Sequence, residues 1–176
     1  MVHRVTNGGD GELPYRNSAG VCLFNKEGKV LIAERSDSPG SWQFPQGGIQ
    51  IDEDPDLAVF REMKEEIGTD NAKIIGRVPE KLRYEFPDYI PGRHALFKGK
   101  YRGQEQIWFA MLFLGKDSEI NLDASLDPEP AEFTAWRWAE LPEILDLIVA
   151  FKRPIYTHVI KCFSPLVKEI KAVQKR

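Results

Sequence analysis

Three glutamates and an arginine near the middle of the chain have the types and spacing for chemistry on phosphates. They lie in the segment Arg61-Glu62-Met63-Lys64-Glu65-Glu66-Ile67-Gly68. At about 100° per residue, Glu62, Glu65 and Glu66 fall within an arc of roughly 100° on one helix. Like charges at this spacing repel by about 0.2–0.5 kcal/mol per pair, so the arrangement gains nothing unless cations occupy it. Hard divalent cations such as Mg²⁺ or Mn²⁺ prefer carboxylate and carbonyl oxygens, which indicates a metal site. A solvated acidic face is the alternative.

The helix that carries these glutamates has its own start and stop signals. Asp54 is a good N-cap, and Pro55 suits the first helical position because its missing N–H would be unpaired there. Gly68 supplies a C-terminal stop. One apolar stripe at spacings of three and four is predicted to face the core, formed by Leu57, Phe60, Met63 and Ile67.

The rest of the chain alternates apolar, β-prone runs with two helical patterns. Strands are predicted over 19–24, 30–35, 72–78, 82–86, 107–114 and 133–138, with a hairpin turn at 25–29. Helices are predicted over 141–151 and 154–173, the second interrupted near Pro165. Strands mixed with helices favour an α/β fold with α/β/α layers. We expect a mobile N-terminal segment over 1–14 and a single domain over 15–176.

The composition is that of an ordinary globular protein. The 176 residues are 42% hydrophobic and 29% charged, with a net charge of −3. Neither a signal peptide nor a membrane-spanning run is evident, so a cytoplasmic protein is expected. Cys22 and Cys162 have no metal-ligand spacing and are too few for a disulfide framework, which predicts reduced thiols.

The segment from Gly47 to Thr69 resembles the Nudix box, the metal site of enzymes that hydrolyse phosphate anhydrides. The box consists of Gly, five residues, Glu, seven residues, Arg-Glu, an apolar residue, any residue, Glu-Glu, any residue, Gly and an apolar residue. The chain meets it at every position but the last, where Thr69 replaces an aliphatic residue. The resemblance implies the Nudix fold, a mixed central sheet between helices with the box as loop-helix-loop.

Segments outside the box resemble one Nudix subgroup, the bacterial RNA pyrophosphohydrolases, also described as asymmetrical dinucleoside polyphosphate hydrolases. The resemblance covers roughly residues 15 to 163. The matching segments are Tyr15-Arg16, residues 42–49, residues 101–109, Glu132-Phe133-x-x-Trp136-Arg137-Trp138 and Phe151-Lys152-Arg153.

The resemblance implies a catalytic role for Arg61, Glu62, Glu65 and Glu132. The implied metal ligands are Gly47 through its carbonyl, Glu53, Glu62, Glu65, Glu66 and Glu132. Glu132 would complete the metal shell or act as general base, a role for which Glu62 is the other candidate. Arg61 would orient the glutamates, and Glu53 would brace the loop or bind an outer metal. The implied cofactor is Mg²⁺, with Mn²⁺ possible, and more than one ion when substrate is bound.

The same resemblance implies seven positions that hold phosphates and nucleobases. They are Arg16, Arg35, Ser41, Tyr84, Gln104, Gln106 and Lys152. Arginine fits phosphate through its planar fork, and an aromatic face can stack on any base. Taken singly, the arginines could be surface cations, Tyr84 could belong to the core, and the glutamines could simply end a loop.

The chain departs from the subgroup at four positions. Asp52 stands where glycine usually precedes the first box glutamate, and Asn17 replaces the proline that commonly follows Tyr-Arg. Lys81 replaces a usual tryptophan, and Ile107 replaces a usual lysine. None of these is an implied metal ligand, so the departures bear on substrate choice more than on chemistry.

The expected function is hydrolysis of 5′-triphosphorylated RNA to 5′-monophosphate RNA and pyrophosphate. The alternative is asymmetric hydrolysis of diadenosine tetra- or pentaphosphate with release of ATP. A remote alternative is a non-catalytic Nudix-fold binding module. Neither a membrane nor DNA is an expected partner, and the oligomeric state is left open.

Overall fold

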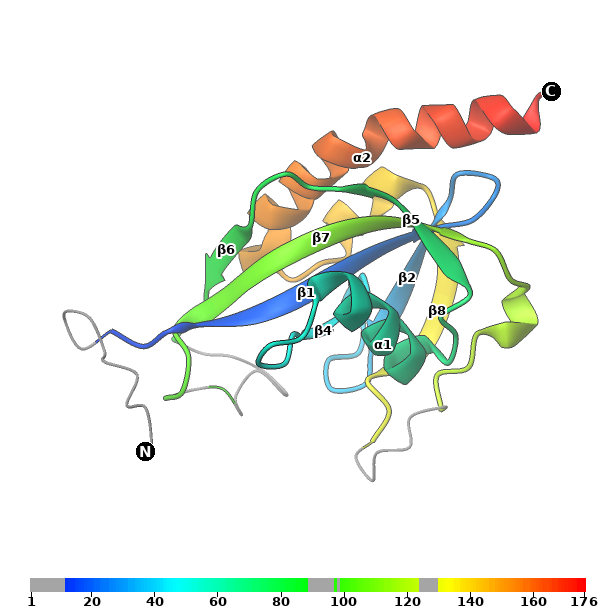
Figure 1. Ribbon diagram of the computed structural model, residues 1–176. Coiled ribbons are helices and arrows are strands. Elements are labelled where there is room, and N and C mark those ends of the chain that lie inside the picture. The colour runs from blue at the N-terminus through cyan, green and yellow to red at the C-terminus, as the bar shows by residue number, and fades with distance from the viewer. Residues whose placement is uncertain (1–11, 89–96, 98, 124–129) are drawn as a thin grey trace.

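The computed structural model describes residues 12–88, 97, 99–123 and 130–176 (Figure 1). Most of the segment predicted to be mobile, residues 1–11, lies outside the described residues. The first strand begins at Tyr15, where the predicted domain begins.

An eight-stranded mixed sheet forms the centre of the molecule. The strands are β1 (Tyr15–Phe24), β2 (Val30–Arg35), β3 (Trp42–Gln43), β4 (Gln46–Gly48), β5 (Ala72–Arg77), β6 (Leu82–Glu85), β7 (Gly103–Phe113) and β8 (Phe133–Ala139). The main path runs β3-β2-β1-β7-β5, while β4 pairs with β1, β6 with β7 and β8 with β2. The predicted mixed sheet is therefore confirmed.

The two longest strands, β1 and β7, lie parallel and in register from Tyr15 beside Gly103 to Phe24 beside Leu112. The far edge of β1 pairs with β4 near one end and with β2 at the other. The far edge of β7 is likewise shared, by β6 near its start and β5 near its end. Because β1 and β7 are parallel, β4 beside β1 and β6 beside β7 lie at the same end of the sheet. The box loop, which follows β4, also lies at this end.

Helix α1 (Pro55–Ile67) confirms the predicted box helix and its signals. The side chain of Asp54 accepts a hydrogen bond from the backbone N–H of Asp56, and Gly68 ends the helix in the left-handed conformation. Val59, Met63 and Ile67 pack on one face of the sheet. Leu57, predicted to face the core, is 66% exposed, because the buried stripe runs through Val59 instead.

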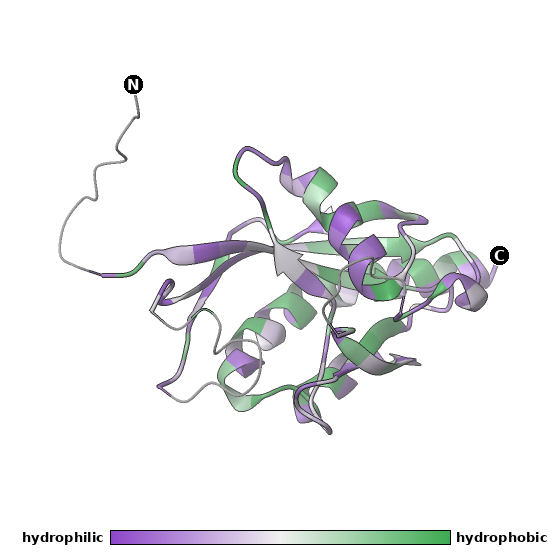
Figure 2. Ribbon diagram, turned by 90° about the horizontal axis from the view of Figure 1, so that it is seen from below, coloured by the Kyte–Doolittle hydropathy of each residue, from purple (hydrophilic) through white to green (hydrophobic). Residues whose placement is uncertain are grey.

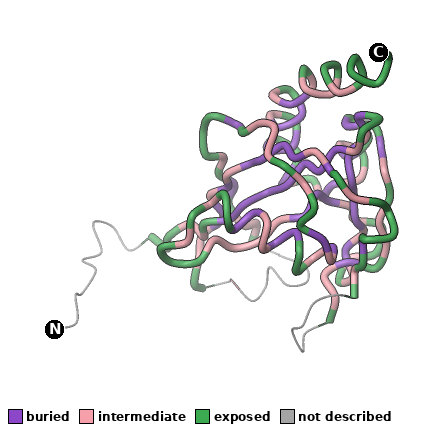
Figure 3. Tube along the Cα trace, turned by 45° about the vertical axis from the view of Figure 1, so that its right-hand side comes forward, coloured by how far each residue is buried: buried purple, intermediate pink, exposed green. Residues whose placement is uncertain are grey.

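Helix α2 (Arg153–Gln174) covers the opposite face of the sheet, as Figures 1 and 2 show. Side chains of β1 alternate between the faces, so that Val21 packs with α1 and Cys22 with Tyr156 of α2. This alternation gives the α/β/α layers their two hydrophobic cores. Figure 3 shows the buried residues along the central strands, whereas the C-terminal part of α2 is largely exposed.

Three sequence expectations need correction. Residues 141–151 do not form one α-helix: they contain two 3₁₀-helices, η3 (Leu141–Asp146) and η4 (Ala150–Lys152). Pro165 does not interrupt α2, because a proline removes one helical hydrogen bond while packing of Phe163 and Leu166 holds the helix against the sheet. Strand β7 begins at Gly103, ahead of the predicted start at 107. The sequence did not indicate this earlier start because polar residues occupy the first positions of the strand. A third 3₁₀-helix, η2 (Asp117–Glu119), follows β7. No helix among the described residues is long and apolar enough to cross a membrane.

Candidate active site

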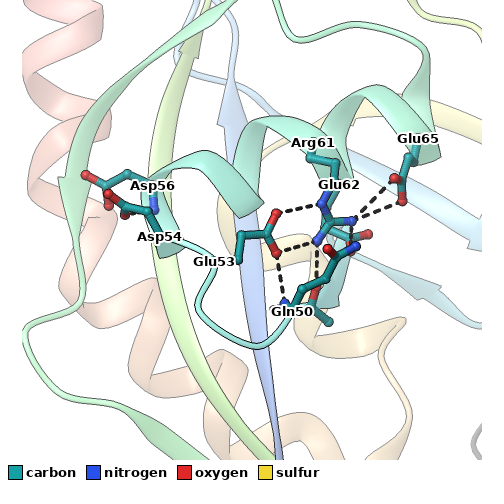
Figure 4. Close-up of polar contacts among 8 residues, drawn as sticks. Gln50, Glu53, Asp54, Asp56, Arg61, Glu62 and Glu65 are labelled. Carbon is teal, nitrogen blue, oxygen red and sulfur yellow. Dashed lines mark hydrogen bonds and ion pairs between the residues drawn. The ribbon is translucent and has the colours of Figure 1, made fainter.

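The guanidinium of Arg61 ties three glutamates of the box together (Figure 4). Nε and Nη2 donate to the two carboxylate oxygens of Glu53 at 2.7 and 2.8 Å. Nη1 donates to Glu62 at 2.8 Å and to both oxygens of Glu65 at 3.3 Å. Nη2 also donates to the carbonyl of Gly48 at 2.8 Å. These contacts hold the three carboxylates around one guanidinium, and the implied role of Arg61 in orienting them for catalysis stays a prediction.

Glu53 braces the loop that precedes α1. Besides its two-point contact with Arg61, it accepts a hydrogen bond from the backbone N–H of Gln50 at 2.8 Å. The ion pair with Arg61, followed by the Gln50 bond, lowers the pKa of Glu53 to about 2. A carboxylate so strongly held in its charged form fixes the start of the helix that carries the other glutamates.

Glu62 is the buried member of the cluster and lies against the backbone of Gly47. Its exposed fraction is 8%, and burial raises its pKa even though Arg61 acts in the opposite direction. A Cβ atom on Gly47 would lie 1.8 Å from Oε2 of Glu62. Only glycine allows this approach, which brings the Gly47 backbone and the Glu62 carboxylate to one place.

Arg16 reaches the same loop from β1. A Cβ atom on Gly48 would lie 2.3 Å from Nη2 of Arg16, so the guanidinium lies over the Gly48 backbone. The guanidinium carbon also lies 4.4 Å from the centre of the Phe97 ring. Arg16 is thus a cation beside the glutamates, where an anionic substrate would need one.

Glu66 contacts the backbone of β4. Its Oε2 accepts a hydrogen bond from the backbone N–H of Gln46 at 3.0 Å. Its charge also raises the pKa of Lys152. The box helix therefore contacts β4 and also acts on a second group of predicted site residues, which includes Lys152.

The second group, called here the Arg35 group, consists of Arg35, Ser41, Tyr84, Glu132 and Lys152. Arg35 is 4% exposed and Lys152 is 1% exposed. Burial and then the charge of Arg35 lower the pKa of Lys152 to about 7, against the opposing charge of Glu132. Two cations buried this closely are held in a place suited to an anion.

Each cation of the Arg35 group has a polar contact of its own. Arg35 makes a two-point ion pair with Asp37 at 2.8 and 2.7 Å. Burial acts to lower the pKa of Arg35, but this ion pair raises it overall. Nζ of Lys152 donates to Oε1 of Gln43 at 3.3 Å. Ser41 exchanges a hydrogen bond of 2.9 Å with the hydroxyl of Ser38.

Gln104 and Gln106 form a buried amide network with the side chains around them. They are 2% and 1% exposed. Ser18 donates to Gln104 at 3.1 Å, and Gln106 donates to Gln104 at 3.1 Å and also to Gln46. Trp108 donates to Gln106 at 3.2 Å. In this structure the two glutamines support β4 through Gln46, so their substrate contact stays a prediction.

The hydroxyl of Tyr84 is buried among the described residues without a hydrogen-bond partner of regular geometry. Burial raises the pKa of Tyr84, while the nearby Gln46 side chain lowers it. Its ring lies 5.7 Å from that of Phe151 and 5.8 Å from Nζ of Lys152. An unpaired buried hydroxyl is costly, so this one is available to a bound molecule.

The donor set fits a hard divalent cation. Glu62, Glu65 and Glu66 supply carboxylates, and the backbone of Gly47 lies against the carboxylate of Glu62. Among the described residues no three His, Cys, Asp or Glu side chains are already gathered around one point. Arg61 neutralises the carboxylates in this arrangement. The chemistry of the set therefore suits Mg²⁺ or Mn²⁺, although the exact ligand positions stay a prediction.

A cleft of about 670 Å³ opens beside Arg61 and Glu62. All four departures from the subgroup pattern line it: Asn17, Asp52, Lys81 and Ile107. Lys81 and Ile107, which were expected near the substrate face, both line this cleft.

Sequence reasoning did not single out Gln43, Gln46 or Asp37 as parts of the site. Gln43 and Gln46 lie in the residues 42–49 that match the subgroup, so a signal was present. Asp37 follows Arg35 by two residues, and this spacing alone does not predict an ion pair. The two side chains meet because the loop after β2 folds back.

The NUDIX domain family matches residues 14–159. A protein named RNA pyrophosphohydrolase from Gluconacetobacter diazotrophicus is 48% identical, over 87% of this chain and 93% of that protein. One of the same name from Rhodospirillum rubrum is 49% identical, over 84% and 86%.

Solved structures share the fold at lower identity. The Escherichia coli dihydroneopterin triphosphate pyrophosphohydrolase has a TM-score of 0.60 and 20% identity, covering 82% of this chain and 96% of that one. A Caenorhabditis elegans Ap4A hydrolase has a TM-score of 0.58 and 19% identity, covering 85% and 98%. The glutamate-bearing helix, the mixed sheet and the matched residues agree, and the chain belongs to the Nudix family.

Proposed function

We propose that this Nudix enzyme hydrolyses the phosphoanhydride bonds of 5′-triphosphorylated RNA, leaving a 5′-monophosphate and releasing pyrophosphate. The observation that carries the proposal is the contact of Arg61 with three box glutamates beside Gly47. Relatives at 48 and 49% identity bear the name of this activity. A cytoplasmic location is part of the proposal and agrees with the two free thiols.

The residues that would hold Mg²⁺ are Glu62, Glu65 and Glu66 with the carbonyl of Gly47, and Glu132. Divalent cations bound there would neutralise the negative charge on the phosphate oxygens. Arg61 keeps the carboxylates in place through its hydrogen bonds, and Arg16 lies over Gly48 where it can contact a phosphate.

The Arg35 group takes the nucleotide end of the RNA in this proposal. Arg35 and Lys152 offer cations to phosphate, and the rings of Tyr84 and Phe151 offer stacking surfaces. The hydroxyl of Tyr84, which lies near the side chain of Gln46, can then also contact the substrate. The phosphates would pass beside β4, where the guanidinium of Arg16 lies over Gly48 and could contact them.

One glutamate must accept the proton of the attacking water, and Glu62 and Glu132 are the candidates. Burial raises the pKa of Glu62 and so improves its strength as a base near neutral pH. The pH dependence of kcat in Glu62→Gln and Glu132→Gln distinguishes them. The variant that lacks the base loses the acid limb of the profile, whereas loss of a ligand alone keeps that limb.

The test of the function is turnover of 5′-triphosphate RNA oligomers with Mg²⁺, with products separated by ion exchange. Diadenosine tetra- and pentaphosphate are compared with RNA as kcat/KM. We expect the higher value for RNA, and loss of turnover in Glu65→Gln and Glu66→Gln with an unchanged fold. Lys64→Gln, an exposed change on the same helix, is the matched control and keeps activity. Unchanged metal-dependent hydrolysis in both glutamate variants would contradict the site assignment.

A further inference from the structure

The amide network connects Trp108, deep in the core, with Gln46, the residue directly before the box. The indole N–H of Trp108 donates to Oε1 of Gln106 at 3.2 Å. Nε2 of Gln106 donates to Oε1 of Gln46 and, at 3.1 Å, to Oε1 of Gln104. The hydroxyl of Ser18 also donates to Oε1 of Gln104 at 3.1 Å. The network therefore joins three strands, β1, β4 and β7.

Trp108 alone among these five side chains gives the network a direction. An indole N–H can donate but cannot accept, whereas a serine hydroxyl and a primary amide can do both. The atom of Gln106 that faces the indole must therefore be its oxygen, so its N–H₂ group points to Gln46 and Gln104. Gln46 must then present its oxygen to Gln106, and its own N–H₂ group faces its other neighbours. Without the indole, each amide of the network could turn over.

The ring of Trp108 is held in one position by its surroundings. Trp108 is fully buried, and its ring lies edge-on to those of Phe44 and Tyr156, with centroids 6.0 and 5.4 Å away. A Cβ atom on Gly20 would lie 2.5 Å from Cε3 of Trp108, so the indole covers the bare backbone of β1. Close packing on this scale leaves no room for another orientation. The indole N–H therefore stays directed at Gln106.

The other end of the network reaches the hydroxyl of Tyr84. Among the described residues this buried hydroxyl has no hydrogen-bond partner of regular geometry. Burial raises the pKa of Tyr84, and the neighbouring side chain of Gln46 acts to lower it. A nearby donor has that effect, which agrees with an N–H₂ group of Gln46 facing the phenol. An amide oxygen at the same place would accept the hydroxyl proton, so the direction of the network explains why Tyr84 lacks an acceptor.

We propose that Trp108 is a positioning residue for substrate binding: through Gln106 and Gln46 it keeps the hydroxyl proton of Tyr84 available for an acceptor oxygen of the substrate. This role rests on the proposed function, in which Tyr84 contacts the substrate. The charges of Arg35 and Arg16 also act on Tyr84, which favours an oxygen with negative charge as its partner. Trp108 itself contacts no substrate in this assignment.

Trp108→Phe removes the directing N–H and keeps an aromatic ring in the core. Gln106 and Gln46 can then turn over, and in the free protein Tyr84 can donate to the oxygen of Gln46. That bond satisfies a buried hydroxyl, so the turned-over network is favoured until substrate breaks it. Apparent affinity falls in proportion to the fraction of molecules that remain competent to bind. We expect the Kd of the substrate to rise about tenfold.

A double-mutant cycle between Trp108 and Tyr84 tests this role. The proteins are wild type, Trp108→Phe, Tyr84→Phe and the double variant. Each is titrated by calorimetry in Mg²⁺ with methylene-bridged, non-hydrolysable analogues of a 5′-triphosphate RNA dinucleotide and of diadenosine tetraphosphate. Trp108→Phe should weaken binding of at least one analogue about tenfold when Tyr84 is present, and less than about twofold in the Tyr84→Phe background.

A purely structural role of Trp108 predicts a different cycle. Loss of core packing would weaken binding equally with and without the Tyr84 hydroxyl, because effects that do not share a partner add. Equal losses in the two backgrounds for both analogues would overturn the proposal. So would an unchanged Kd of both analogues in Trp108→Phe.

Trp138→Phe is the matched control. Nε1 of Trp138 donates to Asp117 at 3.1 Å, so this variant also loses an indole hydrogen bond, but outside the amide network. It should keep the wild-type Kd values. Thermal melts report the stability of every variant. If Trp108→Phe does not fold, Gln106→Met interrupts the same network and should show the same dependence on Tyr84, and additive losses in that cycle would likewise reject the role.

Turnover of 5′-triphosphate RNA by the wild type decides the proposed function separately, because the cycle needs binding alone. RNA turnover together with additive losses in the cycle would reject the positioning role and keep the function. Coupled losses without RNA turnover would keep the positioning role and reject RNA as the substrate.

Discussion

The backbone of Gly47 lies against the carboxylate of Glu62, so closely that a Cβ atom at position 47 would lie 1.8 Å from Oε2. The requirement for glycine here comes from a side chain of α1. It does not come from backbone conformation, because Gly47 is not among the glycines with a positive φ. The contact joins the first fixed residue of the box to a glutamate fifteen positions later.

Gly47→Ala should therefore abolish activity while the protein still folds. The new methyl group must displace the Glu62 carboxylate, and a misplacement of about 1 Å at a reacting centre costs on the order of 100-fold in rate. Overpacking should reduce the free energy of unfolding by about 1–3 kcal/mol. Activity on RNA and urea unfolding measure the two effects.

The control is Gly28→Ala in the turn between β1 and β2. Gly28 has a φ of 77°, so alanine costs stability there through backbone strain, far from the glutamates. If Gly28→Ala lost activity as fully as Gly47→Ala, general destabilisation would explain both results.

Glu53→Gln should remove an acid-sensitive contribution to stability. The pKa of Glu53 is lowered to about 2, below the value near 4.3 of an unfolded glutamate. A carboxyl group with a depressed pKa stabilises the fold above its unfolded pKa, and this contribution is lost as pH falls toward 2. The Tm difference between wild type and variant should thus be constant above pH 5 and shrink between pH 4.3 and 2.

The measurement is a series of thermal melts in chelator, which keeps metal binding out of the comparison. Glu80→Gln, which removes an exposed partner of His158, is the control. A Tm difference that does not change across this acid range would show that the Arg61 contact does not stabilise Glu53 in its charged form.

The box helix was predictable because its signals are local. Asp54, Pro55 and Gly68 fix its ends within a few residues, and the structure has those ends. The prediction of one helix over 141–151 was wrong for the opposite reason, because contacts from outside the segment decide its structure. Those residues follow a helical pattern, but Arg153 donates to the carbonyl of Leu145 and the chain turns twice in 3₁₀ geometry.

The burial of Gln104 and Gln106 could not be read from the sequence. Gln104 and Gln106 alternate along a strand, which predicts a shared face but not which face. Their burial depends on Ser18 and Gln46, which come from distant segments. Tertiary pairing of β1, β4 and β7 therefore decides which predicted residues meet.

Lys152→Met should stabilise the protein below pH 7. Lys152 is buried, and its pKa is lowered to about 7, below the value near 10.4 of an unfolded lysine. Below pH 7 the folded protein must bury the charge, which opposes folding. Replacing a buried charge by an apolar residue of similar volume can stabilise by about 1–4 kcal/mol. The lost bond to Gln43 offsets part of this gain.

The sign of the pH dependence follows from linkage. Between pH 7 and about 10 the unfolded state binds more protons than the folded state, so wild-type stability rises with pH. The advantage of Lys152→Met should shrink over the same range in urea unfolding. Lys161→Met, an exposed change on α2, should show no such trend. A constant advantage would mean that Lys152 does not titrate between pH 7 and 10.

Asp52 adopts a φ of 62°, the left-handed region that favours glycine. This explains why the box usually has glycine at this position, and why aspartate, which tolerates the region better than most residues, can replace it. Asp52→Gly should leave the free energy of unfolding unchanged or raise it by up to about 1 kcal/mol. Asp52→Val should lower it by about 1–2 kcal/mol, since a branched side chain is strained there.

Asp52→Asn separates the backbone role from the charge, because asparagine also tolerates the left-handed region. We expect the Mg²⁺ concentration for half-maximal hydrolysis to be the same in Asp52→Asn and wild type. Asp52 lines the cleft, but the neighbouring Glu53 already carries a negative charge there, which its contact with Arg61 stabilises. A several-fold rise in that concentration would show that the charge of Asp52 attracts the metal. The role of Asp52 in the loop conformation would then be secondary.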